Sequence, residues 1–130
     1  RPGNDVAILS AGTVLPVALA TAEALAADGI RAAVYSFHTL KPLDTATVLA
    51  SVTKTGRLVV VHEANRLCGV GAEIAAVAAE EAYAALKAPV VRLGGPDAPV
   101  ASSFPLEQAF VPQPEAIASA ADRLFRHRPQ

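Results

Sequence analysis

The chain has 130 residues, of which 52% are hydrophobic and 18% are charged, and its formal net charge is −1. This composition indicates one globular domain that buries a substantial core, and it excludes a disordered chain. The small net charge and the lack of a basic run argue against nucleic acid or a membrane surface as a partner, and no apolar run approaches the roughly 20 residues of a membrane span.

Two residue counts bear on the origin of the chain. Its one cysteine, Cys68, has no partner for an internal disulfide, which is typical of a reducing compartment. The chain has no methionine, and we expect it to be a processed piece of a longer protein in which residues 1–130 form one domain.

The first half of the chain predicts two strand-helix units. An apolar strand over residues 5–10 leads into a long helix that Thr13 would cap. A second strand covers residues 30–37. A polar connection then leads to a short helix that either Asp44 or Thr45 would cap.

The second half repeats this order and then becomes irregular. Residues 58–61 form an unbroken apolar run, which is typical of a strand buried on both faces of a parallel sheet. A helix over residues 72–87 and a short strand over residues 89–93 come next. A long irregular segment then precedes a last helix over residues 115–126, whose basic end complements the helix dipole.

Strands that alternate with helices predict an α/β fold, a three-layer α/β/α domain with a mainly parallel sheet and right-handed crossovers. We expect the strand order 2-1-3-4, which is the flavodoxin-like arrangement. This order reverses between the first and third strands. The loop at Gly12 and Thr13 and the loop over residues 62–71 should therefore flank the crevice in which open α/β sheets bind ligands.

The loop after the third strand carries the residues that could support chemistry. His62 and Glu63 could form an acid/base pair, but neighbours in a strand point to opposite faces, so structural or interface roles are favoured. Gly69 and Gly71 could bind a phosphate, but they lack the rest of a dinucleotide fingerprint, and a tight turn before the helix is favoured. Cys68 is favoured as a packed residue rather than a nucleophile, and the histidines form no ligand cluster. The residues by themselves predict no catalytic, cofactor-binding or metal site.

An acidic pair lies on the helix predicted over residues 72–87. Glu80 falls on its polar face, whereas Glu81 falls near Ile74 and Ala78 on the apolar side. The carboxylate of Glu81 in that position indicates one of two things: either it lies at a helix end and reaches water, or it contacts a partner.

Several segments together resemble the C-terminal domain of transketolase-like enzymes that use thiamine diphosphate. These segments are residues 5–12, 41–44, 51–64 and 69–73. Later segments are similar to the β subunit of the E1 component of 2-oxoacid dehydrogenase complexes. These later segments are residues 80–92, 95–99, 106–107 and 112–117. Two short segments differ from E1 β subunits: residues 36–39 are more similar to split transketolases, and residues 65–68 lack the usual small residues.

The resemblance implies a domain that assembles subunits and carries no catalytic group. In this family thiamine diphosphate and Mg²⁺ bind between two other domains, so this domain would hold neither. The implied partners are the E1 α subunit and a second β subunit, and the E2 acyltransferase would dock through a small basic domain. The parent enzyme would decarboxylate a 2-oxo acid and pass the acyl group to lipoamide, in the bacterial cytoplasm or the mitochondrial matrix.

The resemblance also directs attention to two groups of residues. We expect subunit contacts in the loop after the third strand, at His62, Glu63, Asn65, Arg66, Gly69 and Gly71. Glu80 and Glu81 would contact E2, because acidic charge complements a basic partner. Two alternatives stay open: the same domain from a split transketolase, and a free-standing flavodoxin-like module that binds a small anion at Gly12 and residues 69–71.

Overall fold

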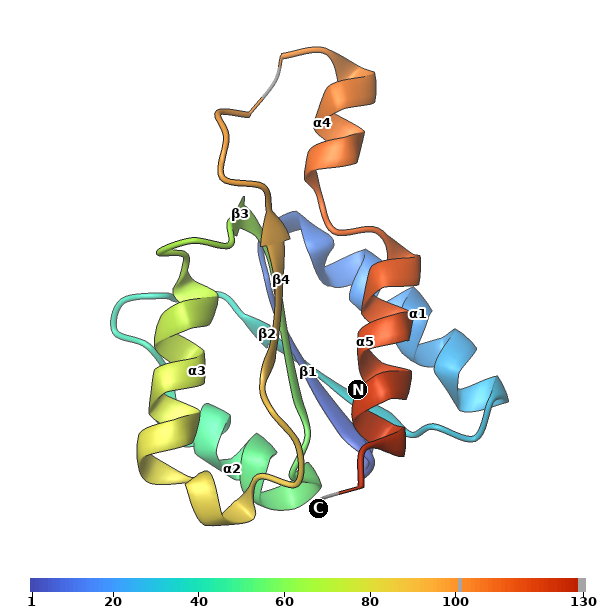
Figure 1. The fold of residues 1–130 in the computed structure, drawn as a ribbon, viewed down its shortest axis with the longest axis vertical. Coiled ribbons are helices and arrows are strands. Elements are labelled where there is room, and N and C mark those ends of the chain that lie inside the picture. The colour runs from blue at the N-terminus through green and yellow to red at the C-terminus, as the bar shows by residue number, and fades with distance from the viewer. Residues whose placement is uncertain (101, 129–130) are drawn as a thin grey trace.

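The computed structural model describes residues 1–100 and 102–128. In this part of the chain a single sheet has the spatial order β2-β1-β3-β4 (Figure 1). Its strands are β1 (Val6–Ala11), β2 (Ala32–Phe37), β3 (Leu58–Asn65) and β4 (Val91–Gly95). All three strand pairs are parallel. The predicted α/β class and the strand order are confirmed.

Helices cover both faces of the sheet (Figure 1). α1 (Leu15–Ala27) and α5 (Pro114–Arg126) pack on one face, and α2 (Thr45–Thr55) and α3 (Val70–Glu81) pack on the other. Two 3₁₀ turns, η1 (Gly12–Val14) and η2 (Tyr83–Ala85), follow β1 and α3. α4 (Phe104–Phe110) projects beyond the carboxyl end of the sheet. No helix of the described residues is both long enough and apolar enough to cross a membrane.

The two central strands supply both layers of the core. Ile8 and Val59 face α1 and α5, whereas Leu9 and Val60 face α2 and α3. Successive side chains of a strand point to opposite faces, so a strand covered on both sides must be apolar at every position. This is the physical reason for the unbroken apolar run in β3.

The helix starts show one correct and one wrong cap prediction. Asp44 caps α2, since its Oδ1 accepts a hydrogen bond of 3.0 Å from the backbone N–H of Thr47. The prediction for Thr13 is wrong: Thr13 lies within η1, and α1 begins at Leu15 without a side-chain cap.

Two other boundaries differ because of contacts that are distant in sequence. α3 ends at Glu81, well before the predicted end near residue 87, and the backbone N–H of Lys87 bonds to the carbonyl of Gly56 at 2.7 Å. β3 continues to Asn65, so that His62 and Glu63 are strand residues. α4 lies within the segment predicted to be irregular. Only Phe110 of this helix is buried, which leaves little helical periodicity to detect.

Candidate functional site at the carboxyl end of the sheet

The turn after β1 meets the carboxyl-terminal part of β3, at the end of the sheet where the sequence predicts a crevice. The hydroxyl group of Thr13 donates a hydrogen bond to the carboxylate of Glu63. Gly12 has a φ of +79°, and a Cβ at this position would lie 2.9 Å from Oε1 of Glu63. Glycine is needed here both for the backbone conformation and for the close approach of Glu63. The carboxylate therefore occupies the crevice in which a small anion would bind.

His62 points to the opposite face of the sheet, toward α3, and is 3% exposed. Its Nδ1 lies 3.1 Å from the carbonyl oxygen of Ala64, while Nε2 has no hydrogen-bond partner among the described residues. Burial lowers the pKa of His62; the hydrogen bond to Ala64 opposes this shift, and the positive charge of Arg92 adds to it. The ring is thus neutral near pH 7, with the proton on Nδ1 donated to Ala64.

Three glycines surround the imidazole ring of His62. An added Cβ would lie 2.7 Å from Cε1 at Gly69, 2.8 Å from Nε2 at Gly71 and 2.9 Å from Cε1 at Gly94. Gly69 has a φ of −77°, so conformational freedom is not what requires glycine there. At Gly71 the ring is the nearest obstacle to a side chain. At Gly69 the carbonyl oxygen of Asn65 is closer still. At Gly94 the carbonyl oxygen of Ala64 is as close as the ring, at 2.9 Å. Gly94 belongs to this group although sequence reasoning did not identify it.

Asn65 and Arg66 connect this loop to β4 and to the segment beyond it. The Nδ2 group of Asn65 donates to the carbonyl of Ala98 at 3.4 Å, and the backbone N–H of Arg66 donates to the carbonyl of Gly95 at 2.9 Å. The carbonyl of Arg66 accepts a hydrogen bond of 3.1 Å from Nη1 of Arg92. These polar groups of the loop thus bind to β4 and to the segment beyond it.

The six predicted interface residues fall into two groups. His62, Gly69 and Gly71 pack against each other inside the domain and set the shape of the loop. Glu63 and Arg66 are exposed and Asn65 is half-buried, so that these three are available to a partner.

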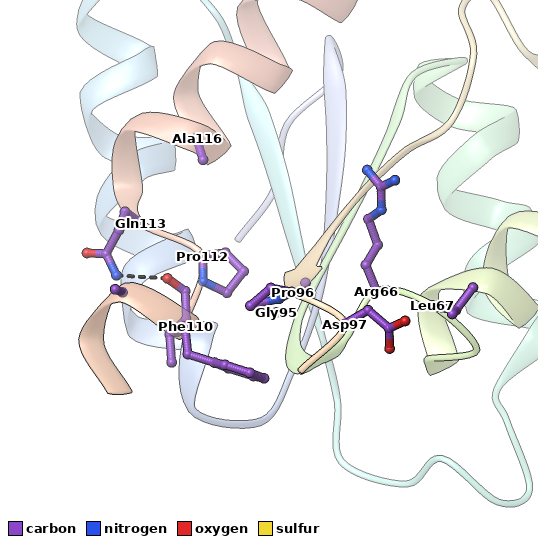
Figure 2. A pocket seen from close by; sticks show the side chains of 12 residues that line it. Arg66, Leu67, Gly95, Pro96, Asp97, Phe110, Pro112, Gln113 and Ala116 are labelled. Carbon is purple, nitrogen blue, oxygen red and sulfur yellow. Dashed lines mark hydrogen bonds between the residues drawn. The ribbon is translucent and has the colours of Figure 1, made fainter. Parts of the chain in front are cut away.

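A cavity of about 610 Å³ opens beside Arg66 (Figure 2). Figure 2 shows Gly95 and Pro96 between the ring of Phe110 on one side and Arg66 on the other. Arg66 and Asp97 are the ionisable residues in its lining. Sequence reasoning missed Phe110 and Gly95 because it did not predict α4. Gly95 packs against the ring of Phe110, and this contact between distant residues leaves no local pattern in the sequence.

Exposed apolar side chains gather at the same end of the molecule. We call them the apolar rim, and they are Leu67, Val100, Phe104 and Leu106, which are 62%, 63%, 72% and 59% exposed. They belong to the loops after β3 and β4 and to α4. Such clusters of exposed apolar side chains are typical of protein–protein contacts.

Glu80 and Glu81 lie at the other end of α3 from this loop (Figure 1). Both are exposed, and neither forms an ion pair within the described residues. The structure therefore keeps the two groups of predicted contact residues on separate surfaces. Within the same part of the chain, no three His, Cys, Asp or Glu side chains come together as a metal site would require.

Comparison with known proteins agrees with this architecture. The family model described as "Transketolase, C-terminal domain" matches residues 1–117. The chain is 42% identical over 126 residues to the acetoin:2,6-dichlorophenolindophenol oxidoreductase subunit beta of Cupriavidus necator, covering 97% of this chain and 37% of that protein. It is 43% identical over 126 residues to the pyruvate dehydrogenase E1 component subunit beta of Leifsonia xyli, covering 95% and 36%. It is 44% identical over 123 residues to the mitochondrial pyruvate dehydrogenase E1 component subunit beta-1 of Arabidopsis thaliana, covering 95% and 34%.

A solved structure described as "Split gene transketolase, inactive beta4 tetramer" is 29% identical, with a TM-score of 0.86 over 99% of this chain and 42% of that one. The chain spans about a third of the length of the curated relatives it matches. The matched residues include all the strands of the described sheet and the loop around His62. The chain therefore belongs to the family of transketolase C-terminal domains.

Proposed function

We propose that this chain is the subunit-assembly domain of the E1 β subunit of a 2-oxoacid dehydrogenase. Relatives that are named as β subunits match at least 95% of the chain at 42–44% identity. The observation that carries the proposal is the carboxyl end of the sheet. There the hydroxyl of Thr13, the carboxylate of Glu63 and the backbone groups of Arg66 form hydrogen bonds within the domain, and large apolar side chains are exposed. Such a surface suits a protein partner better than a small substrate.

The partners in this proposal are the E1 α subunit and a second β subunit. Purified protein carrying Phe104→Asp and Leu106→Asp should assemble poorly with the α subunit, because a charge on the apolar rim would have to be desolvated. Tyr83→Asp is the matched control, since Tyr83 is 77% exposed but lies in η2, before β4. Analytical ultracentrifugation measures the mass of the assembly. An unchanged mass for the double variant would remove the apolar rim as an interface.

The parent enzyme would decarboxylate a 2-oxo acid and transfer the acyl group to lipoamide, with thiamine diphosphate supplying the carbanion chemistry and Mg²⁺ binding its diphosphate. The residues of this domain do not fit that cofactor. The described residues offer no donor set for Mg²⁺, and the carboxylate of Glu63 at Gly12 would repel a pyrophosphate. We therefore place the cofactor outside this domain. Calorimetry of this chain with thiamine diphosphate and Mg²⁺ should detect no binding, and tight binding or turnover would contradict the assignment.

The E2 acyltransferase is a further partner in the proposal, through Glu80 and Glu81. Both carboxylates are exposed and complement a small basic domain. Glu80→Lys with Glu81→Lys should weaken E2 binding, whereas Glu23→Lys with Glu115→Lys changes the charge equally at other helices. Surface plasmon resonance with the E2 binding domain compares the two. Equal affinities would exclude this contact.

The parent is placed in the bacterial cytoplasm or the mitochondrial matrix. This placement follows relatives that include a Leifsonia xyli protein and a mitochondrial Arabidopsis thaliana protein. Fractionation of the source cells would test it, and recovery of the protein outside both compartments would contradict it.

A second candidate is the corresponding domain of a split transketolase. It is favoured by the solved split-gene transketolase that superposes over 99% of the chain. Assays of the assembled parent separate the candidates, because E1 releases CO₂ from a 2-oxo acid whereas a transketolase moves a two-carbon ketol group between sugars.

A further inference from the structure

Four basic residues line one cavity between the outer edge of β4 and α5. The cavity has a volume of about 390 Å³. We call this cavity the basic groove, and its basic residues are Arg66, Arg92, Arg123 and His127. Among the residues that the structure describes, no aspartate or glutamate lines this cavity. None of the four forms an ion pair within residues 1–100 and 102–128. The three arginines thus concentrate positive charge here, although the net charge of the chain, counted with neutral histidine, is −1.

The basic groove follows a free strand edge. β4 is the last strand of the sheet and pairs with β3 alone in the described part of the chain. At the opposite edge, β2 already exchanges two backbone hydrogen bonds of 3.0 Å between Val34 and Arg1. The carbonyl of Gly95 faces inward to the N–H of Arg66. Because successive residues of a strand alternate, the backbone N–H and C=O of Arg92 face outward.

Two adjoining cavities extend the basic groove along β4. The cavity of about 610 Å³ at the carboxyl end shares Arg66 with it. Another cavity, of about 420 Å³ at the amino end, shares Pro89 and His127. The three cavities together adjoin both ends of β4, which is more room than a single small anion needs. This length suits an extended polypeptide.

A charged residue on an edge strand often serves only to prevent unwanted strand pairing. Arg92 alone would be enough for that purpose. Here, however, the other three basic groups come from the loop after β3, from α5 and from the residue after α5. Gathering like charges without a carboxylate is unfavourable in the isolated domain. The arrangement therefore indicates an acidic partner rather than a guarded edge.

We propose that the basic groove binds an acidic segment of a partner protein in extended conformation, as an added strand beside β4. The segment would pair with the outward N–H and C=O of Arg92, and its carboxylates would contact the guanidinium groups of Arg66 and Arg123. This site is distinct from Glu80 and Glu81, which are suited to a basic partner. It does not depend on the identity of the parent enzyme.

Fluorescence anisotropy of a labelled peptide tests the proposal. The peptide has blocked ends, alternates Glu and Val, and has about seven residues, to cover the 5 residues of β4 and their flanks. Arg66→Glu with Arg123→Glu should raise its Kd at least about tenfold, which corresponds to about 1.4 kcal/mol. Lys41→Glu with Lys54→Glu makes the same change in charge near β2 and α2, and should change the Kd less than about twofold. Circular dichroism checks that each variant is folded, and Arg123→Glu alone serves if the double variant is not.

A second measurement distinguishes strand addition from simple charge attraction. Hydrogen exchange of the Arg92 amide, followed by NMR, should slow when the peptide is bound. A peptide with Gln in place of Glu should bind at least about tenfold more weakly. Equal losses in the two double variants, or an unchanged exchange rate at Arg92, would overturn the proposal. So would binding of inorganic phosphate or a single-stranded oligonucleotide as tightly as the peptide, because either result would indicate a general anion site.

Discussion

His62 shows how one side chain determines the shape of a loop. Its imidazole ring lies near the end of β3, close to Gly69, Gly71 and Gly94. A side chain at any of these three positions would collide with the ring. Its Nδ1 is held by the carbonyl of Ala64 at 3.1 Å. The ring therefore joins the end of β3, the start of α3 and the end of β4 in one packing unit.

The buried ring predicts a pH dependence of stability. Burial lowers the pKa of His62 below its ordinary value of 6.5, so the unfolded chain takes up the proton at a higher pH than the folded chain does. The stability contributed by neutral His62 is complete above about pH 6.5 and is lost as the pH falls below that value. The urea midpoint should therefore fall more between about pH 7.5 and 5.5 in the natural protein than in His62→Asn. An equal fall in both proteins would contradict this prediction.

Gly71 offers a test of the packing around the ring. A Cβ there would lie 2.8 Å from Nε2 of His62. Gly71→Ala should therefore lower the free energy of unfolding by about 1–3 kcal/mol. The same substitution should have a smaller effect in a His62→Ala background, since the obstructing ring is gone. Urea denaturation of the four proteins in a double-mutant cycle measures this coupling. Equal effects in both backgrounds would show that the ring is not the obstacle.

Among the helices, α1 and α2 begin in different ways. α2 has a side-chain cap, because Asp44 accepts from the backbone N–H and the hydroxyl of Thr47 at 3.0 and 2.6 Å. α1 is preceded by η1, and the hydroxyl of Thr13 bonds to Glu63 instead. A threonine before a helix can cap that helix or bond to a neighbouring element. Thr13 does the second, because Glu63 of β3 lies within reach of its hydroxyl.

The cap of α2 gives a prediction for this element. Asp44→Ala should lower the Tm, because the first-turn N–H of Thr47 loses its acceptor. Asp44→Asn should retain most of the stability, since asparagine caps helices about as well as aspartate does. Thermal unfolding followed by circular dichroism compares the variants. If Asp44→Asn loses as much stability as Asp44→Ala, the charge of Asp44 matters more than its role as a cap.

In the whole molecule, stability and partner contact belong to different regions. The two core layers lie on the faces of the sheet, whereas the apolar rim lies beyond its carboxyl end (Figure 1). Ile8 is fully buried, and Ile8→Ala should lower the free energy of unfolding by about 2–5 kcal/mol. Leu106 is 59% exposed, and Leu106→Ala should change it by no more than about 0.5 kcal/mol. Urea denaturation measures both, and a large loss for Leu106→Ala would show that α4 contributes to the core.

The amino-acid sequence by itself determined the α/β class, the parallel strand order, a polar cap at Asp44 or Thr45, and the presence of a loop between the third strand and its helix. Each of these follows from apolar periodicity, from a local cap or from general rules of chain connection, which depend on residues close together in the chain. Only the tertiary structure decided the end of α3, the presence of α4, the partner of Thr13, the contact of three glycines with His62, and the basic groove. These depend on close approach between distant segments: Thr13 and Glu63 are 50 residues apart, and Arg66 and Arg92 are 26 apart. A local sequence pattern does not indicate which distant atoms will occupy the space beside a glycine, because those atoms come together only when the sheet and its helices pack.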